Sequence, residues 1–264
     1  MCDNPTMHIV AITQLGGPVE AEAVALALDL DSAPYDERLN LNVGLPVIVL
    51  GTPDEARARR VHAQIQQRGH QALVVNGADV VPSTRMISLR RFGLDERAVL
   101  ATDKPGESLP YDEITTLVRA TSDQVTETTE VFKEKKFDMG RALVTGGLVI
   151  SKTTTQKVTT SHHKTDDVLY LFRRGGGKPW FLRASGTHYT PLGEALAPTA
   201  RANFLGLIEL LRRRAPRAIY SESLVALRKV PERARRAAAG IHALSSSPEG
   251  GTDLLAHILA LSSV

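Results

Sequence analysis

The sequence predicts a mixed α+β protein made of an N-terminal unit of strands and helices, a strand-rich middle region and a basic helical tail. Three observations predict it: strand-like and helix-like runs alternate near the N-terminus, short β-branched runs dominate the middle, and helix-forming residues dominate the end. A chain of 264 residues that is 42% apolar is long enough for one or two domains. We expect two domains and a tail, over residues 1–84, 85–215 and 216–264.

The N-terminal unit begins with an apolar, β-branched run at residues 7–15, which predicts a strand. Gly16, Gly17 and Pro18 interrupt the run, and residues 19–30 are helix formers without a breaker. A loosely alternating stretch at 34–41 and an apolar run at 45–51 then predict a β-hairpin.

A second helix and a last strand complete this unit. Thr52 is a plausible N-cap, with Pro53 at the first helical position, and Gly69 marks the end of the helix. Residues 70–77 read as a strand. The resulting order, β-α-β-β-α-β over residues 7–77, is that of ferredoxin-like domains. Val47 and Val49 are expected to be among the most buried side chains.

The middle region contains a series of short strand-like runs and one closing helix at 199–214. The segments LPYDEITTLVR (109–119) and NFLGLIELLRRR (203–214) resemble parts of bacterial pleckstrin-homology-type domains. The resemblance covers residues 86–215 and implies a bent antiparallel sheet plugged by a helix, used to bind partners or lipid headgroups. Residues 133–166 would be an insertion in it. The whole chain also resembles bacterial proteins of this two-domain type, a resemblance that implies no particular activity.

The tail is predicted to contain a linker at 245–252 and a last helix at 253–261, with Thr252 as its N-cap. The apolar residues of that helix recur on one side, and a helix so short needs another surface to cover it. We expect that surface to belong to another molecule, with docking onto the chain's own body as the alternative. The predicted partner-binding residues are Leu254, Leu255, Ile258 and Leu259.

Charge is distributed unevenly along the chain, although its formal net value is only +3. Residues 7–84 carry nine acids and five arginines, whereas 212–236 carry nine Lys or Arg against two acids. A basic segment of this kind can bind an anionic partner, or it can be a solvated surface. The candidate anion-binding residues are Arg212, Arg213, Arg214, Lys229, Arg233, Arg235 and Arg236.

Motifs that would carry catalysis, a cofactor or a metal are weak. The segment GGLVISKT (146–153) lacks the glycine that a phosphate loop places before Lys152. His162 and His163 are adjacent and would point to opposite sides of an extended chain, away from a common ion. We therefore predict no catalytic, cofactor-binding or metal-binding residues.

The favoured function is that of a non-enzymatic regulatory or adaptor protein that binds a protein partner, with a homodimer as one form of partnership. An enzyme or sensor for an anionic small molecule such as a nucleotide is the first alternative, and binding of nucleic acid or an anionic membrane is the second. A lone cysteine, Cys2, and a start without a charged and apolar leader indicate the cytoplasm.

Overall fold

The computed structural model describes residues 6–137, 151–227 and 230–263, with backbone only for 123–137 and 151–164. The chain divides into two compact units, one of Met1–Ser122 with Asp166–Val264 and the other of Asp123–Thr165. The mixture of helices and several sheets confirms the α+β class. No helix in the described part of the chain combines the length and apolar character that a membrane span requires.

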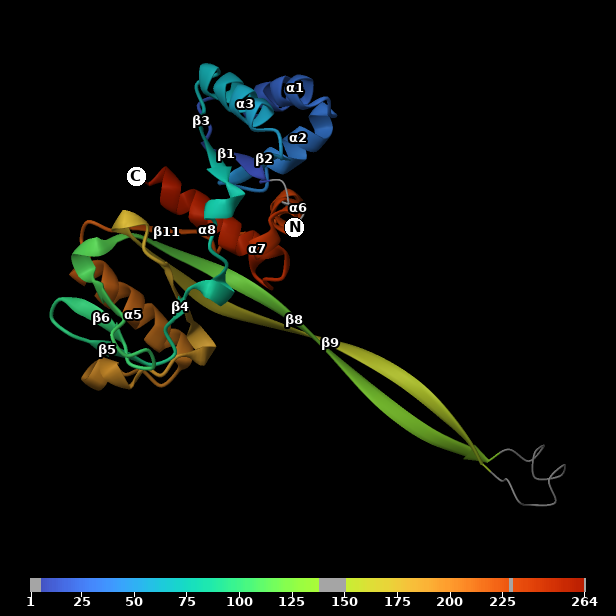
Figure 1. The fold of residues 1–264 in the computed structure, drawn as a ribbon, viewed down its shortest axis with the longest axis vertical. Helices are drawn as coiled ribbons and strands as arrows, with labels where there is room; N and C mark the ends of the chain where they lie inside the picture. The colour runs from blue at the N-terminus through green and yellow to red at the C-terminus, as the bar shows by residue number, and fades with distance from the viewer. Residues whose placement is uncertain (1–5, 138–150, 228–229, 264) are drawn as a thin grey trace. The chain divides into compact units, whose positions relative to one another are not determined.

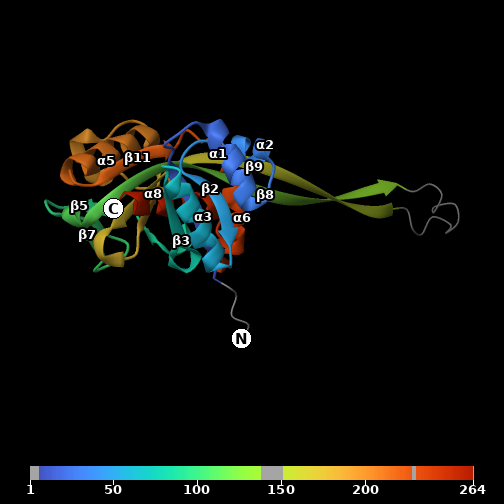
Figure 2. The same cartoon turned by 90° about the horizontal axis from the view of Figure 1, so that it is seen from above.

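The N-terminal sheet has three strands in the order β2-β1-β3. Strand β1 (His8–Gln14) lies in the middle and pairs antiparallel with β2 (Val47–Thr52) and with β3 (Gln71–Asn76). Helices α1 (Val19–Leu30), α2 (Pro34–Leu41) and α3 (Glu55–Gln67) cover one face of this sheet (Figures 1 and 2).

Alternating residues of the central strand face two different cores, as the two-residue period of a strand requires. Val10 and Ile12 pack with α1, α2 and α3, whereas Ile9 and Ala11 pack with the C-terminal helices. Val47 and Val49 are 1% and 3% exposed, which confirms that they are core residues.

The strand expected at residues 34–41 is wrong, because this segment forms helix α2. Pro34 is at the start of the helix, where its missing N–H costs nothing, and Asp36 and Glu37 occupy the first turn, where acids are favoured. The N-terminal order is therefore β-α-α-β-α-β with three strands, not the ferredoxin-like β-α-β-β-α-β. The N-cap of α3 is Asp54 and not Thr52: its carboxylate accepts a hydrogen bond of 3.0 Å from the backbone N–H of Arg57.

The strand-rich region contains a five-stranded sheet in the order β11-β8-β9-β10-β4 and a three-stranded sheet in the order β5-β6-β7. Because β11 runs parallel to β8, and β4 parallel to β10, the larger sheet is mixed and not wholly antiparallel. The bounds of these strands are β4 Ile87–Ser88, β5 Phe92–Leu94, β6 Ala98–Ala101, β7 Ser108–Pro110, β8 Ile114–Phe137, β9 Ser151–Arg173, β10 Trp180–Arg183 and β11 Ile219–Leu224.

The expected closing helix is present as α5 (Ala200–Arg214), and Thr199 caps it by accepting from the N–H of Ala202 at 3.1 Å. Phe204, Leu207 and Ile208 of α5 are buried in one core with side chains of the larger sheet. The predicted insertion 133–166 falls on the far parts of the neighbouring strands β8 and β9 and on residues 138–150, which lie outside the described chain.

The tail consists of α6 (Glu232–Gly240), α7 (His242–Ser245) and α8 (Gly250–Ser262). Residues 245–252 are therefore not simply a linker, since α7 ends and α8 begins within them. Helix α8 shares one core with β1 and β3 of the first sheet and with β8 and β9 of the larger one (Figure 1). Folding of the segments 1–84, 85–215 and 216–264 as separate domains stays a prediction.

The apolar residues of α8 lie inside the chain's own core, so the expectation that they face another molecule is corrected. Leu254, Leu255 and Ile258 are 0%, 1% and 0% exposed, and Leu259 is partly buried. Ala256 and Ala260 are buried on other sides of α8. Most of α8 is covered by the chain itself, so the stripe is only one part of its buried surface, whereas Leu261 near its end is 54% exposed.

Candidate functional site

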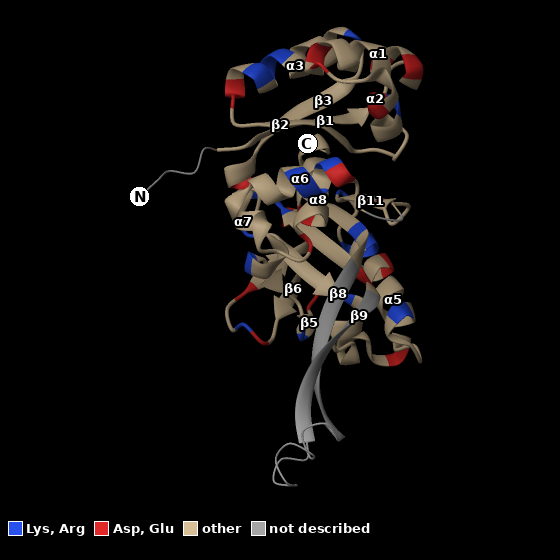
Figure 3. Cartoon of the chain, turned by 90° about the vertical axis from the view of Figure 1, so that its right-hand side faces the viewer, with Lys and Arg blue, Asp and Glu red and all other residues tan. Residues whose placement is uncertain are grey.

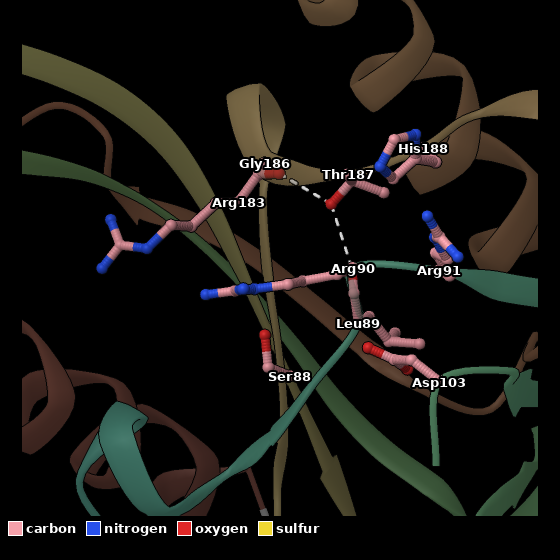
Figure 4. A pocket seen from close by; sticks show the side chains of 9 residues that line it. All are labelled: Ser88, Leu89, Arg90, Arg91, Asp103, Arg183, Gly186, Thr187 and His188. Atoms are coloured by element: carbon pink, nitrogen blue, oxygen red, sulfur yellow. Dashed lines mark hydrogen bonds between the residues drawn. The ribbon is translucent and has the colours of Figure 1, made fainter. Parts of the chain in front are cut away.

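A pocket of about 530 Å³, called the basic pocket below, lies where the chain leaves β4 and passes the end of β10 (Figure 4). Its cationic side chains are Arg90, Arg91 and Arg183, and His188 stands beside them. Asp103 is the acidic residue in its wall. The volume falls within the range of about 300–1,000 Å³ that is usual for small-molecule sites.

Strand pairing places Arg90 at this pocket. The N–H of Ile87 donates to the carbonyl of Pro179 at 3.0 Å, and the N–H of Leu89 donates to that of Phe181 at 2.8 Å. Ile87 and Leu89 are both buried, at 5% and 2% exposed. Because side chains alternate along an extended chain, Arg90 is directed away from that core and is exposed.

Thr187 and His188 hold the other wall against the same segment. The hydroxyl of Thr187 lies 3.0 Å from the carbonyl oxygen of Leu89 and 2.8 Å from that of Arg183, as the dashed lines of Figure 4 show. The N–H of His188 donates to the carbonyl of Arg90 at 2.9 Å. These bonds fix the backbone around the pocket while leaving the Arg90 side chain unused.

The pocket carries positive charge that the described part of the chain does not neutralise. Neither Arg90 nor Arg91 takes part in any ion pair or side-chain hydrogen bond found among the described residues. In Figure 4 the guanidinium groups of Arg90 and Arg183 extend to the same side of the view. A guanidinium presents paired N–H donors that match carboxylate and phosphate oxygens.

Arg183 connects the pocket to the protein interior. Its Nη2 is paired with the carboxylate of Glu249, which is 4% exposed, and its guanidinium lies 5.1 Å from the centre of the Phe181 ring. Its Nη1 is buried and has no hydrogen-bond partner among the described residues. A buried donor left unpaired is costly, so an acceptor that reached Nη1 would gain from satisfying it.

A buried polar cluster next to Arg183 contains the carboxylates of Asp253 and Glu249. It links the start of α8 to Ser83, Ser122 and Tyr170, which come much earlier in the chain. The carboxylate of Asp253 accepts from the Ser83 N–H and from the hydroxyls of Ser247 and Tyr170, each at 2.9 Å. The carboxylate of Glu249 accepts from the hydroxyls of Ser83 and Ser122, each at 3.1 Å. Burial raises the pKa of Asp253 to about 6, although these donors oppose the change.

His257 belongs to the same helix and is neutral. Its Nε2 accepts from the N–H of Val81 at 3.1 Å, so the proton sits on Nδ1 and is donated to the carbonyl of Asp253 at 2.9 Å. Burial lowers the pKa of His257 to about 4. Both ring nitrogens are used by the backbone, which makes His257 a structural residue here.

The chemistry available in the basic pocket is recognition of an anion. Ser88 and Thr187 are its hydroxyl residues, and neither forms a hydrogen bond to the ring of His188. Without such a bond the hydroxyls lack the neighbouring base that activates a nucleophile. Arg90 and Arg183, whose guanidinium groups extend to the same side in Figure 4, suit a ligand with several anionic oxygens, and the guanidinium of Arg91 lies on the other side of the Arg90 backbone.

The described candidate anion-binding residues lie on the closing helix α5 and on α6 of the tail, and they do not gather into one patch. Figure 3 shows basic residues on α5 and on α6, which are separate elements, with acidic residues beside them. Arg212 pairs with Glu209, while Arg235 and Arg236 pair with Glu232.

The other candidate arginines either contact residues of the chain itself or form no ion pair among the described residues. Arg214 donates to the hydroxyl of Tyr111 at 2.8 Å, and Arg233 pairs with the buried carboxylate of Glu37. Arg213 is exposed without an ion pair among the described residues, and Lys229 lies outside them.

The weak motifs of the sequence are not tested by the structure. The segment 146–153 and the side chains of His162 and His163 lie outside what is described. Among the side chains that are described, no three of His, Cys, Asp or Glu form a group suited to a metal ion.

Sequence reasoning missed the residues that line the basic pocket. Arg90 and Arg91 stood within a strand-like run, where two neighbouring arginines carry only a weak signal. Two acids of the N-terminal unit, Glu22 and Glu37, are 2% and 0% exposed, and each pairs with an arginine.

Comparison of the chain with protein-family models, with curated proteins and with solved structures gives no match. Its function is therefore inferred from the geometry and chemistry of the described residues.

Proposed function

We propose that this chain is a binding protein that senses an anionic small molecule, such as a nucleotide or another phosphate-bearing compound, in the basic pocket. The observation that carries the proposal is the pair Arg90 and Arg91, exposed at the pocket without an ion pair among the described residues. Positive charge concentrated in a concave site attracts anions and holds them by charge-assisted hydrogen bonds.

Arg183 adds a reason for selectivity. Its pairing with Glu249 connects the pocket to the buried polar cluster of α8. Its Nη1, which has no partner among the described residues, is a further donor for a ligand. A ligand with two phosphate groups reaches more of the three arginines than a single phosphate does. Pyrophosphate is therefore expected to bind at least tenfold more tightly than inorganic phosphate.

The test is isothermal titration of the full chain with pyrophosphate, ATP and inorganic phosphate. Arg90→Gln and Arg91→Gln, alone and together, remove positive charge from exposed positions and should weaken binding at least tenfold in the double variant. Arg213→Gln is the matched control, because it removes the same charge from an exposed arginine outside the pocket. Binding that is absent from the wild type, or equal in the double variant and the control, would reject the proposal.

A second proposal keeps the adaptor function and moves the partner-binding surface to helices α1 and α2. Large apolar side chains that are 42–82% exposed occur on these helices and directly after them. Exposed acids, Glu20, Asp31 and Asp36, occur among them. This α1–α2 face fits a protein partner that presents apolar anchors flanked by Lys or Arg. Its exposed apolar residues are Val24, Leu28, Tyr35, Leu39 and Val43.

Leu28→Glu tests the adaptor proposal, since Leu28 is 82% exposed and the change should leave the fold intact. We expect a protein that co-purifies with the wild type at moderate salt to be lost with this variant and kept with Leu205→Glu, a control on α5 where the leucine is 37% exposed. Light scattering separates this result from a homodimer. Retention of every co-purifying protein by Leu28→Glu would remove the α1–α2 face from consideration.

Three further expectations remain proposals. Seven strands, β4 to β10, followed by α5 agree in layout with a pleckstrin-homology-type domain, despite the mixed sheet. The cytoplasm is proposed as the compartment on the single cysteine. Binding of nucleic acid or an anionic membrane through the basic segment 212–236 ranks last, because most of its described candidate arginines already pair with acids of the chain.

A further inference from the structure

A second pocket, of about 690 Å³, lies on a different part of the molecule, beside the C-terminal end of α8. Its wall comes from β3, from the ends of β8 and β9 and from β11, and Figure 1 shows the end of α8 between β3 and β11. None of its lining residues belongs to the basic pocket.

The wall of this α8 pocket is mostly apolar. Val75 and Ile114 are 2% exposed and Phe172 is 8% exposed, and they face a space that Ala260 leaves open because its side chain is small. The ring of His257 stands edge-on to Phe172 at 5.0 Å between centroids. His257 is neutral and bonded to the backbone through both nitrogens, so it adds no charge.

Two features at the edge of the α8 pocket indicate an occupant. Ile219 and Leu261 line it and are 47% and 54% exposed, which is apolar surface left in water. Arg174 and Arg217 also line it, are exposed, and form no ion pair among the described residues.

The remaining charged groups at the edge leave a positive excess. Arg173 is neutralised by Glu113, and Asp79 is the acid in the lining. An apolar interior beside uncompensated guanidinium groups is complementary to a molecule with an apolar body and an anionic end.

We propose that the α8 pocket binds a free organic anion of this kind, with the size and chemistry of a medium-chain carboxylate. The apolar body lies against Phe172 and Ala260, and the carboxylate faces Arg174 and Arg217. This site goes beyond the proposed recognition of small anions and does not depend on it.

The first experiment titrates the full chain with decanoate below its micelle concentration, and with decanol and acetate. Decanol retains the apolar body without the charge, and acetate retains the charge without the body. Decanoate should bind at least tenfold more tightly than either. Equal binding of decanol would overturn the anionic end, and absence of decanoate binding would overturn the proposal. Binding to phosphatidylglycerol vesicles without binding of decanoate would assign the surface to a membrane and would also overturn it.

Variants locate the site. Ala260→Phe fills the pocket, and Leu261→Glu places a negative charge at an exposed edge position, so it tests the same site if Ala260→Phe does not fold. Arg174→Glu with Arg217→Glu reverses the charge at the edge. Each change should weaken decanoate binding at least tenfold, whereas Arg213→Glu, outside both pockets, should leave it unchanged.

Two cross-tests keep this proposal separate from the anion-sensing function. Arg90→Gln should leave decanoate binding unchanged, and Leu261→Glu should leave pyrophosphate binding unchanged, because the two pockets share no residue. Decanoate binding that survives the α8-pocket changes and falls with Arg90→Gln would overturn the assignment to the α8 pocket.

Discussion

The hydroxyl of Tyr170 donates a 2.9 Å hydrogen bond to Oδ1 of Asp253, and this bond joins strand β9 to helix α8 across 83 positions of the sequence. Both residues are 0% exposed. The bond is one of several in which distant segments donate to the carboxylates of Asp253 in α8 and of Glu249 directly before it, and it explains how the acidic start of this helix lies in a core.

Tyr170→Phe removes this bond and leaves a buried carboxylate oxygen without its donor. We expect a loss of about 1.5–3 kcal/mol in the free energy of unfolding, the range for bonds to charged groups. Tyr189→Phe is the control, because the Tyr189 hydroxyl donates to the neutral carbonyl of Ala184 and should cost about 0.5–1.5 kcal/mol. Denaturant unfolding measures both; equal losses would contradict a charged Asp253.

The C-terminal helix is expected to be required for folding. Deletion of residues 245–264 would expose the face of the first sheet that carries Ile9 and Ala11. Leu254→Ala should cost about 2–5 kcal/mol, as for other fully buried leucines, whereas Leu261→Ala should cost under about 0.5 kcal/mol. Thermal melts of the two variants decide the matter, and an unchanged melting temperature for Leu254→Ala would show that α8 is not part of the core.

The ion pair of Arg233 with Glu37 is expected to be essential because Glu37 is 0% exposed. Arg233 contacts both carboxylate oxygens, at 2.7 and 2.5 Å. Arg233→Met should cost about 3–5 kcal/mol by leaving a buried charge without its partner. Arg236→Met on the same helix breaks only an exposed pair with Glu232 and should cost about 0–1 kcal/mol. Similar losses from the two changes would refute a buried charge at Glu37.

Asp253 and His257 are expected to give opposite contributions to the dependence of stability on pH. The pKa of Asp253 rises from 3.8 to about 6 on folding, so its contribution is present at low pH and is lost as pH rises through 6. The pKa of His257 falls from 6.5 to about 4, so its contribution is present above 6.5 and is lost as pH falls through 4.

Single variants separate the two contributions between pH 4 and 6.5. With Asp253→Asn the remaining histidine should make stability rise with pH, and with His257→Gln the remaining acid should make it fall. Melting temperatures recorded across this window test both signs. The same slope in the two variants would show that one of the two groups does not titrate as its burial requires.

Local signals in the sequence determined the elements that local physics stabilises. The closing helix, the buried strand with Val47 and Val49, and the α+β class follow from spacing and composition within a few residues, whereas the expected caps Thr52 and Thr252 are not the N-caps of α3 and α8. Residues 34–41 show the limit, because Tyr35, Leu39 and Leu41 fit a strand and a helix almost equally well. Pro34 and the contacts of Glu37 favour the helix.

The tertiary structure alone decided which surfaces are inside and which charges are paired. The apolar stripe of α8 is typical of a docking surface, but in the folded chain β1, β3 and β9 cover it. Arg90 and Arg183 are far apart in sequence, and pairing of β4 with β10 brings them to one pocket. The burial of a side chain and the meeting of two side chains in one pocket depend on contacts between segments that are distant in sequence. Periodicity and composition describe neighbours along the chain, so they do not predict those contacts.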